Sequence, residues 1–125
     1  MSASNFLETR LLEGTLTGNT YTAPANVYAA LFSTTLTDAV SGTEITGNGY
    51  SRQAVAFAVT GALAENTGNI TFTCTGNAWP TVRAFALFDA SSTGNALYWT
   101  NIIPISVQAT ENVVFTTDSI QVTAE

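Results

Sequence analysis

The sequence predicts an all-β fold, an antiparallel β-sandwich of jelly-roll type with about eight strands and a short N-terminal helix. Short runs in which Val, Ile, Phe or Leu alternate with small or polar residues are typical of strands that bury one face. The tripeptide Thr-Gly-Asn occurs five times and supplies the Gly and Asn that tight turns between strands require. Hydrophobic residues make up 46% of the 125 residues and charged residues 10%, which favours one folded core over disorder.

A helix of two to three turns is expected at the start of the chain. Asn5, followed three residues later by Glu8, fits a capping box, and Gly14 fits a C-terminal stop. The apolar stripe of this helix is narrow and consists of Phe6, Leu7, Leu11 and Leu12. Such a stripe does not fold alone, so we expect residues 1–14 to form a helix or docking arm and residues 15–125 to form the sandwich.

The expected strands follow this helix in order. They cover residues 27–33, 54–59, 70–75, 84–87, 97–100, 102–108, 113–115 and 119–123. About eight strands of this length require two packed sheets, which is the basis for predicting a sandwich. Pro104 has no backbone N–H, so the strand that contains it is expected at an edge or at a β-bulge.

Residues 34–49 form an expected loop that is longer than most loops in compact domains, and long loops tend to be contact surfaces. The core of a sandwich is formed mainly by its strands, so the apolar side chains of this loop and of the helical stripe are the ones least required for the core. The predicted protein interface therefore consists of Phe6, Leu7, Leu11, Leu12, Leu36, Val40 and Ile45. The alternative that these side chains belong to the core stays open.

The charge balance excludes several classes of partner. Three Arg, no Lys and no His stand against nine acidic residues, for a net charge of −6, whereas nucleic-acid binding needs clustered cations. No apolar run approaches the roughly 20 residues of a membrane helix. Glu8, Arg10 and Glu13 lie where a signal peptide would be apolar. We expect a soluble protein made without export, with no nucleic-acid or membrane partner.

The residue types also argue against catalysis and against a bound cofactor. Most hydrolase mechanisms need a His or Lys base, and the chain has neither. The lone Cys74 has no partner for an internal disulfide and no His to activate it, so we interpret it as a small core residue. We therefore predict no catalytic residue, no cofactor and no metal.

Acidic side chains leave two alternatives open. Asp38, Glu44 and Asp89 could supply the two carboxylates of a glycosidase, and the first two could contribute to a calcium site, although EF-hand spacing is missing. The favoured interpretation is structural: Asp38 and Glu44 are solvated or paired with Arg52. Asp89 is then expected to hydrogen-bond its own turn at Ser91 or Ser92.

Aromatic residues raise the possibility of sugar binding. Trp79, Tyr98 and Trp99 could form a stacking platform for a pyranose, and the competing interpretation is core packing. On a strand, Tyr98 and Trp99 point to opposite faces, so at most one of them would face a ligand.

One long motif carries a resemblance to a known family. Residues 42–55, GTEITGNGYSRQAV, resemble the Gly-Thr-Glu loop and the following Gly-Tyr and Arg-Gln-Ala-Val segments of a family of small tailed-bacteriophage virion proteins described as tail-fibre proteins. The other matching residues are 7–12, 21–24, 27–35, 79, 81–82, 85, 87–90, 94–95, 97 and 118–123. The chain departs from the family pattern at Pro80, Ala84 and Ala86.

The resemblance implies a non-enzymatic structural protein of the virion. A compact domain of this length has a radius of gyration of about 14 Å, and without heptads or repeats it does not make a fibre shaft. Packaged DNA would repel its acidic surface, which favours the outer surface of the particle. We expect a capsid decoration or cement protein that binds the major capsid protein or other virion proteins, as a homotrimer. The alternative is a tail or fibre-tip component that binds a host-surface receptor or sugar.

Overall fold

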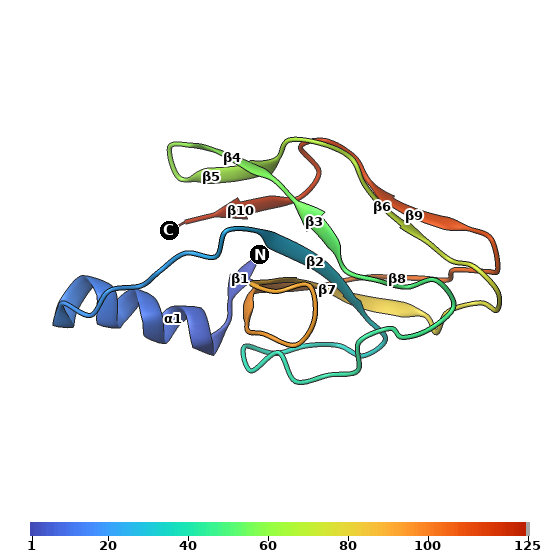
Figure 1. The fold of residues 1–125 in the computed structure, drawn as a ribbon, viewed down its shortest axis with the longest axis horizontal. Coiled ribbons are helices and arrows are strands. Elements are labelled where there is room, and N and C mark those ends of the chain that lie inside the picture. The colour runs from blue at the N-terminus through green and yellow to red at the C-terminus, as the bar shows by residue number, and fades with distance from the viewer. Residues whose placement is uncertain (125) are drawn as a thin grey trace.

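A computed structural model describes residues 1–124, and in them it has ten strands and one short helical segment (Figure 1). In chain order the elements are β1 (Ser2–Ala3), α1 (Asn5–Leu12), the π-helical η1 (Glu13–Thr17), β2 (Val27–Phe32), β3 (Gln53–Val55), β4 (Phe57–Thr60), β5 (Leu63–Asn66), β6 (Ile70–Thr73), β7 (Val82–Phe88), β8 (Ala96–Ile105), β9 (Asn112–Phe115) and β10 (Gln121–Thr123). The prediction of an all-β fold with one short N-terminal helix is confirmed.

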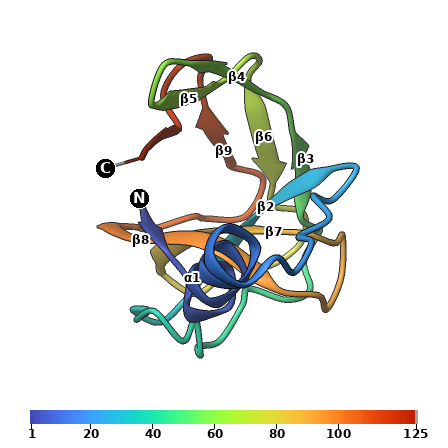
Figure 2. The same ribbon diagram turned by 90° about the vertical axis from the view of Figure 1, so that its left-hand side faces the viewer.

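The strands form two layers. The first layer is a five-stranded sheet with the order β1-β8-β7-β2-β3. The second consists of a three-stranded sheet, β10-β5-β4, and a two-stranded sheet, β6-β9. All pairs are antiparallel, and Figure 2 shows the five-stranded sheet facing the smaller sheets. Each layer thus contains five strands, and the strands of the second layer are divided between two separate sheets.

The main core lies between the layers. Its most completely buried large side chains include Leu31 and Leu87 from the five-stranded sheet and Phe72 from the two-stranded sheet. A second cluster covers the outer face of the five-stranded sheet and contains Ala30, Phe32, Leu36, Ala84, Ala86 and Phe88. Both faces of β2 and β7 are therefore buried. Part of the long loop after β2 covers their outer face and belongs to this second cluster.

Two of the expected strand boundaries differ from the structure. The expected strand at 54–59 is broken at Ala56, because β3 pairs in the five-stranded sheet and β4 pairs in the three-stranded sheet. The segments expected at 97–100 and 102–108 are joined in one strand, β8, which ends at Ile105, so residues 106–108 lie outside it. Sequence pattern did not predict β1, which has two residues, or β5, whose sequence Leu-Ala-Glu-Asn does not alternate.

Pro104 lies where the sequence places it, at an irregularity. Val82 of β7 pairs with Ile105 of β8, but the next paired residues are Ala84 and Asn101. Strand β8 thus has two more residues than β7 between these two pairs. The other neighbour of β8 is β1, which pairs only with Tyr98 and Trp99. Pro104 therefore sits in a bulge with no ladder partner on its outer side, as expected for a residue without an N–H.

The helical segment begins one residue earlier and ends later than predicted. Ser4, not Asn5, is the N-cap, and its Oγ accepts a hydrogen bond from the Leu7 N–H at 3.2 Å. The helix does not stop at Gly14 but continues as η1 to Gly18, which ends it with a φ of +79°. We call residues 5–17 the helical arm. Within residues 1–124, no helix is long and apolar enough to cross a membrane.

The Thr-Gly-Asn tripeptides mostly mark changes of chain direction. Their glycines have a positive φ at Gly18, Gly47, Gly76 and Gly94, whereas Gly68 does not. The positive φ explains why glycine occupies these four positions, since a side chain would be strained there. The first of them ends the helical arm and does not join two strands.

Candidate functional site

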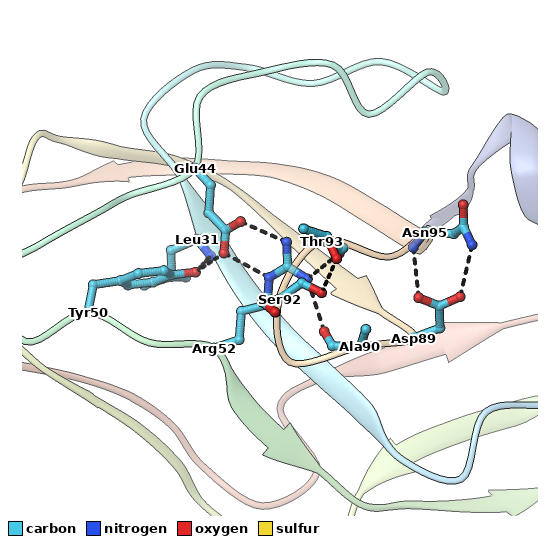
Figure 3. A network of polar contacts seen from close by, with 9 residues as sticks. All are labelled: Leu31, Glu44, Tyr50, Arg52, Asp89, Ala90, Ser92, Thr93 and Asn95. Atoms are coloured by element: carbon cyan, nitrogen blue, oxygen red, sulfur yellow. Dashed lines mark hydrogen bonds and ion pairs between the residues drawn. The ribbon is translucent and has the colours of Figure 1, made fainter.

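Three polar side chains of the long motif meet in one partly buried network (Figure 3), which we call the polar clamp: Glu44, Tyr50 and Arg52. The guanidinium of Arg52 binds the Glu44 carboxylate with two bonds, Nη2 to Oε1 at 2.8 Å and Nε to Oε2 at 2.9 Å. Arg52 Nη1 donates to the carbonyl oxygens of Ala90 at 2.9 Å and Thr93 at 2.8 Å. The Arg52 side chain is 7% exposed and that of Glu44 23%. The clamp therefore joins the long loop to the turn between β7 and β8.

Tyr50 connects the clamp to β2. Its hydroxyl donates to Glu44 Oε2 at 2.7 Å and accepts from the backbone N–H of Leu31 at 3.0 Å. Burial, and the bond to Glu44, raise the pKa of the Tyr50 hydroxyl above its ordinary value of 10.0. The ring stacks on Phe72 and meets the edge of Trp79. Tyr50 is thus a protonated cross-link between the loop and both layers.

The clamp has the chemistry of a structural element and not of a catalyst. Both Glu44 oxygens accept charge-assisted or phenolic hydrogen bonds, so neither is free to act as a base. The Arg52 guanidinium carbon lies 3.8 Å from the centre of the Phe88 ring, a cation–π contact that holds it further. The predicted pairing of Glu44 with Arg52 is confirmed.

The Gly-Asn-Gly part of the same motif holds Trp79 in the core. The carbonyl of Asn48 accepts from the Trp79 indole N–H at 3.0 Å and from the Thr75 N–H at 2.8 Å. Gly49 has a φ of +84°, and a Cβ there would meet Thr75 Oγ1 and lie 2.9 Å from the Thr73 carbonyl oxygen. Trp79 is buried, so the core-packing interpretation holds for it and it is not a sugar platform.

Asp89 also has a structural role, but its hydrogen-bond partner is not the one expected. Its two oxygens accept from the Asn95 N–H at 2.7 Å and from the Asn95 side-chain amide at 3.1 Å (Figure 3). The expected partners were Ser91 or Ser92; the actual bond closes the whole turn between β7 and β8. Within residues 1–124, no group of three or more His, Cys, Asp or Glu side chains is placed to hold a metal ion.

The third acidic candidate, Asp38, lies in an open polar groove of about 960 Å³. Its Oδ1 accepts from the Trp99 indole N–H at 3.1 Å, and Glu8 and Asn101 also line the groove. Trp99 is half-buried against the outer cluster, whereas Tyr98 packs on the main core. The prediction that these two aromatic residues point to opposite faces is confirmed, and Trp99 is the one on the groove.

Five of the seven residues predicted for a protein interface are wholly or partly buried by the chain itself. Leu7, Leu36 and Ile45 are buried, so these three are core residues and offer no surface to a partner. Phe6 and Val40 are half-buried. The long loop looked like spare surface in the sequence, but it covers the outer face of the five-stranded sheet.

The other two predicted residues are exposed near the tip of the helical arm. Leu11 is 46% exposed and Leu12 is 60% exposed. Leu16 is 76% exposed and was missed because the helix was expected to end at Gly14; its spacing of four from Leu12 was the signal. Other large exposed apolar residues lie apart from the arm on β4, β8 and β9: Val59, Ile103 and Val114.

These features define an all-β structural body with a projecting helical arm. The chain matches the family model described as "Podophage GP4 fiber I protein gp80" over residues 2–123 and belongs to that family. It is therefore a fibre-type structural protein of a bacteriophage virion, in agreement with the resemblance carried by residues 42–55. No curated protein matches the chain.

Proposed function

We propose that this protein is a non-enzymatic component of the tail-fibre apparatus, located on the outer surface of the virion. The observation that carries the proposal is the family match over residues 2–123, because the family is described by a fibre protein. The match spans nearly the whole chain, so it applies to the sandwich and to the helical arm together.

The carboxylates support a role without catalysis. Glu44 is held by Arg52 and Tyr50, Asp89 by Asn95, and Asp38 by Trp99. A glycosidase needs one carboxyl free to donate a proton and a second free to attack or to activate water. Each of these three residues instead stabilises a loop, a turn or the start of the arm.

The compact shape makes this chain a fibre-associated module and not a shaft. Its strands are short, and no repeat extends them in one direction. The same shape and the net charge of −6 were the basis for expecting a head decoration protein that binds the major capsid protein. The fibre description of the family favours the tail, so the head becomes the second candidate.

The groove at Trp99 supports a finer possibility within the tail assignment. A half-buried indole beside Asp38, Glu8 and Asn101 offers an aromatic surface with carboxylate and amide groups, which is the chemistry that recognises sugars. If the groove binds host-surface sugar, Trp99→Ala abolishes adhesion to host envelopes, whereas Ile103→Ala on the same strand leaves adhesion unchanged. Equal adhesion of both variants would exclude the groove.

Antibody labelling of purified particles tests the tail assignment. A tag inserted in the exposed turn at Gly61 and Ala62, between β4 and β5, allows labelling away from the arm and the clamp. Electron microscopy is expected to show label confined to the tail. Label distributed over the head would instead support the decoration protein, and particles without label at either place would contradict both.

A further inference from the structure

The helical arm carries apolar surface that its own fold leaves uncovered. Leu11, Leu12 and Leu16 are all exposed, and within the arm only Leu7 near its base is fully buried. Thr15 and Thr17 donate side-chain hydrogen bonds to arm carbonyls at 2.7 Å, so the tip is stabilised by its own residues. A helix this short is marginal in water unless its apolar face is covered.

The same chain has an open apolar pocket of about 180 Å³ at one end of the sandwich. Phe57, Ala64 and Val122 line it from the three-stranded sheet, and Leu87, Leu97 and Tyr98 line it from the five-stranded sheet. If each carbon takes roughly the 30 Å³ of a water molecule, a leucine side chain needs about 120 Å³. The volume of the pocket is therefore large enough for one leucine side chain.

The arm cannot fill the pocket of its own molecule. Its base is tied to the outer side of the five-stranded sheet, where the Asn5 N–H donates to the Asp38 carbonyl at 2.8 Å. The pocket opens on the other side, between the two layers. Figure 2 shows α1 and the three-stranded sheet on opposite sides of the five-stranded sheet. An arm that enters the pocket must come from another molecule.

The same chain carries both an exposed leucine that its own fold leaves uncovered and a leucine-sized pocket, so a second copy is the partner that fits both. Each molecule carries a net charge of −6, so two copies repel each other unless they meet at uncharged surfaces. From Gly14 to Thr37 the chain has no charged residue, and none of the pocket-lining residues is charged. Leu16 can therefore enter the pocket without burying a charge, while Glu13, next to Leu12, keeps its exposed ion pair with Arg10.

We infer that the arm of one copy inserts Leu16, flanked by Leu12, into the pocket between the layers of a second copy. Each copy then donates one arm and receives another in its pocket. Such contacts are satisfied in every copy of a two-fold dimer or of a closed ring, such as the trimer expected from the sequence. This contact does not depend on whether the assembly sits on the tail or on the head.

Analytical ultracentrifugation of purified protein tests the contact with two variants and a control. Leu16→Glu removes the apolar tip, and Ala64→Phe fills the pocket. Ile103→Glu, at a residue 88% exposed on β8, places the same charge elsewhere. Wild type and Ile103→Glu are expected to rise above single-chain mass with concentration. The other two variants are expected to stay at single-chain mass, with association weakened at least tenfold.

Mixing the two defective variants gives the most specific result. Ala64→Phe still has an intact arm and Leu16→Glu still has an intact pocket, so an equimolar mixture is expected to form a two-chain species that grows no further. A wild type that stays at single-chain mass, or a mixture of folded variants without the two-chain species, would overturn the inference. The first result would leave the fibre assignment standing, because that rests on location in the particle.

A cross-linking experiment covers the case in which Ala64→Phe does not fold. Leu16→Cys and Ala64→Cys are mixed and oxidised mildly, while the native Cys74 is buried and does not compete. A disulfide-linked heterodimer is expected from this mixture and not from Leu16→Cys mixed with Ile103→Cys. Equal cross-linking in both mixtures would contradict the contact.

Discussion

Arg52 is one of three cations in the chain, and its side chain makes four hydrogen bonds while almost none of it is exposed. Opposite charges eight residues apart made its pairing with Glu44 predictable from the sequence. Its two bonds to the β7–β8 turn were not predictable, because they join residues about forty positions apart. The most specific motif of the sequence therefore serves to hold loops together.

Removing the positive charge of Arg52 from the polar clamp is expected to lower the free energy of unfolding. Arg52→Ala leaves Glu44 partly buried without its partner, and breaking a buried pair in this way costs about 3–5 kcal/mol of unfolding free energy. Glu13→Gln breaks the exposed Arg10–Glu13 pair and is expected to cost less than about 0.5 kcal/mol. Urea unfolding of both variants measures the difference. Similar losses would contradict the structural role of the clamp.

Tyr50 makes stability depend on pH. Because its pKa is raised in the folded state, its contribution is complete below pH 10, where unfolded tyrosine titrates, and is lost as the pH rises further. Wild type is expected to lose unfolding free energy between pH 9 and about 11. Tyr50→Phe is expected to start less stable by about 1 kcal/mol and to lose less over this range. If the unfolding free energies of wild type and Tyr50→Phe fell in parallel as the pH rose, the pKa of the Tyr50 hydroxyl would not be raised in the folded state.

Asn66 is a buried polar residue that sequence pattern did not single out. Its side chain donates to the carbonyls of Gly68 at 2.8 Å and Thr116 at 2.9 Å, and accepts from the Ile120 N–H at 2.8 Å. Asn66→Ala leaves three buried backbone groups unpaired, at a cost of about 3 kcal/mol. Asn19→Ala, at an exposed position, is the matched control. Thermal unfolding that does not separate the two variants would contradict this assignment.

At the scale of elements, strands in which apolar residues alternate with polar or small ones could be predicted from the sequence. Strands that exist only because they pair with other strands could not. β2, β6, β7 and β9 lie within two residues of the expected positions. β5 shows no apolar–polar alternation because none of its four side chains is exposed, and the polar Glu65 and Asn66 stand side by side in its sequence. The break at Ala56 follows from the passage of the chain between layers, which no local pattern reports.

The start of the helical arm was predicted one residue late for a physical reason. Ser4 and Asn5 are both good N-caps, but Ser4 Oγ also donates to the Ala96 carbonyl and so ties the arm to β8. Ser4→Ala is expected to cost about 1 kcal/mol and to speed hydrogen exchange at the Leu7 amide. Ser2→Ala, which leaves the cap intact, is the control. Unchanged exchange at Leu7 would argue against Ser4 as the cap.

At the scale of the whole molecule, the sequence predicted the all-β body and the candidate arm but not the surface that is left free. Leu36 and Ile45 are as apolar as Leu12 and Leu16, and only the tertiary fold decides that the first pair is buried and the second exposed. The candidate interface thus shifted from the long loop to the arm tip. The family match then places this body among fibre-type virion proteins.

The number of copies per virion tests the central claim most directly. Quantitative mass spectrometry of purified particles gives the ratio of this protein to the major capsid protein. A component of the tail-fibre apparatus is expected in a few copies up to a few tens, in a fixed ratio to other tail proteins. A ratio near that of the capsid subunits themselves, or complete absence from purified particles, would contradict the account.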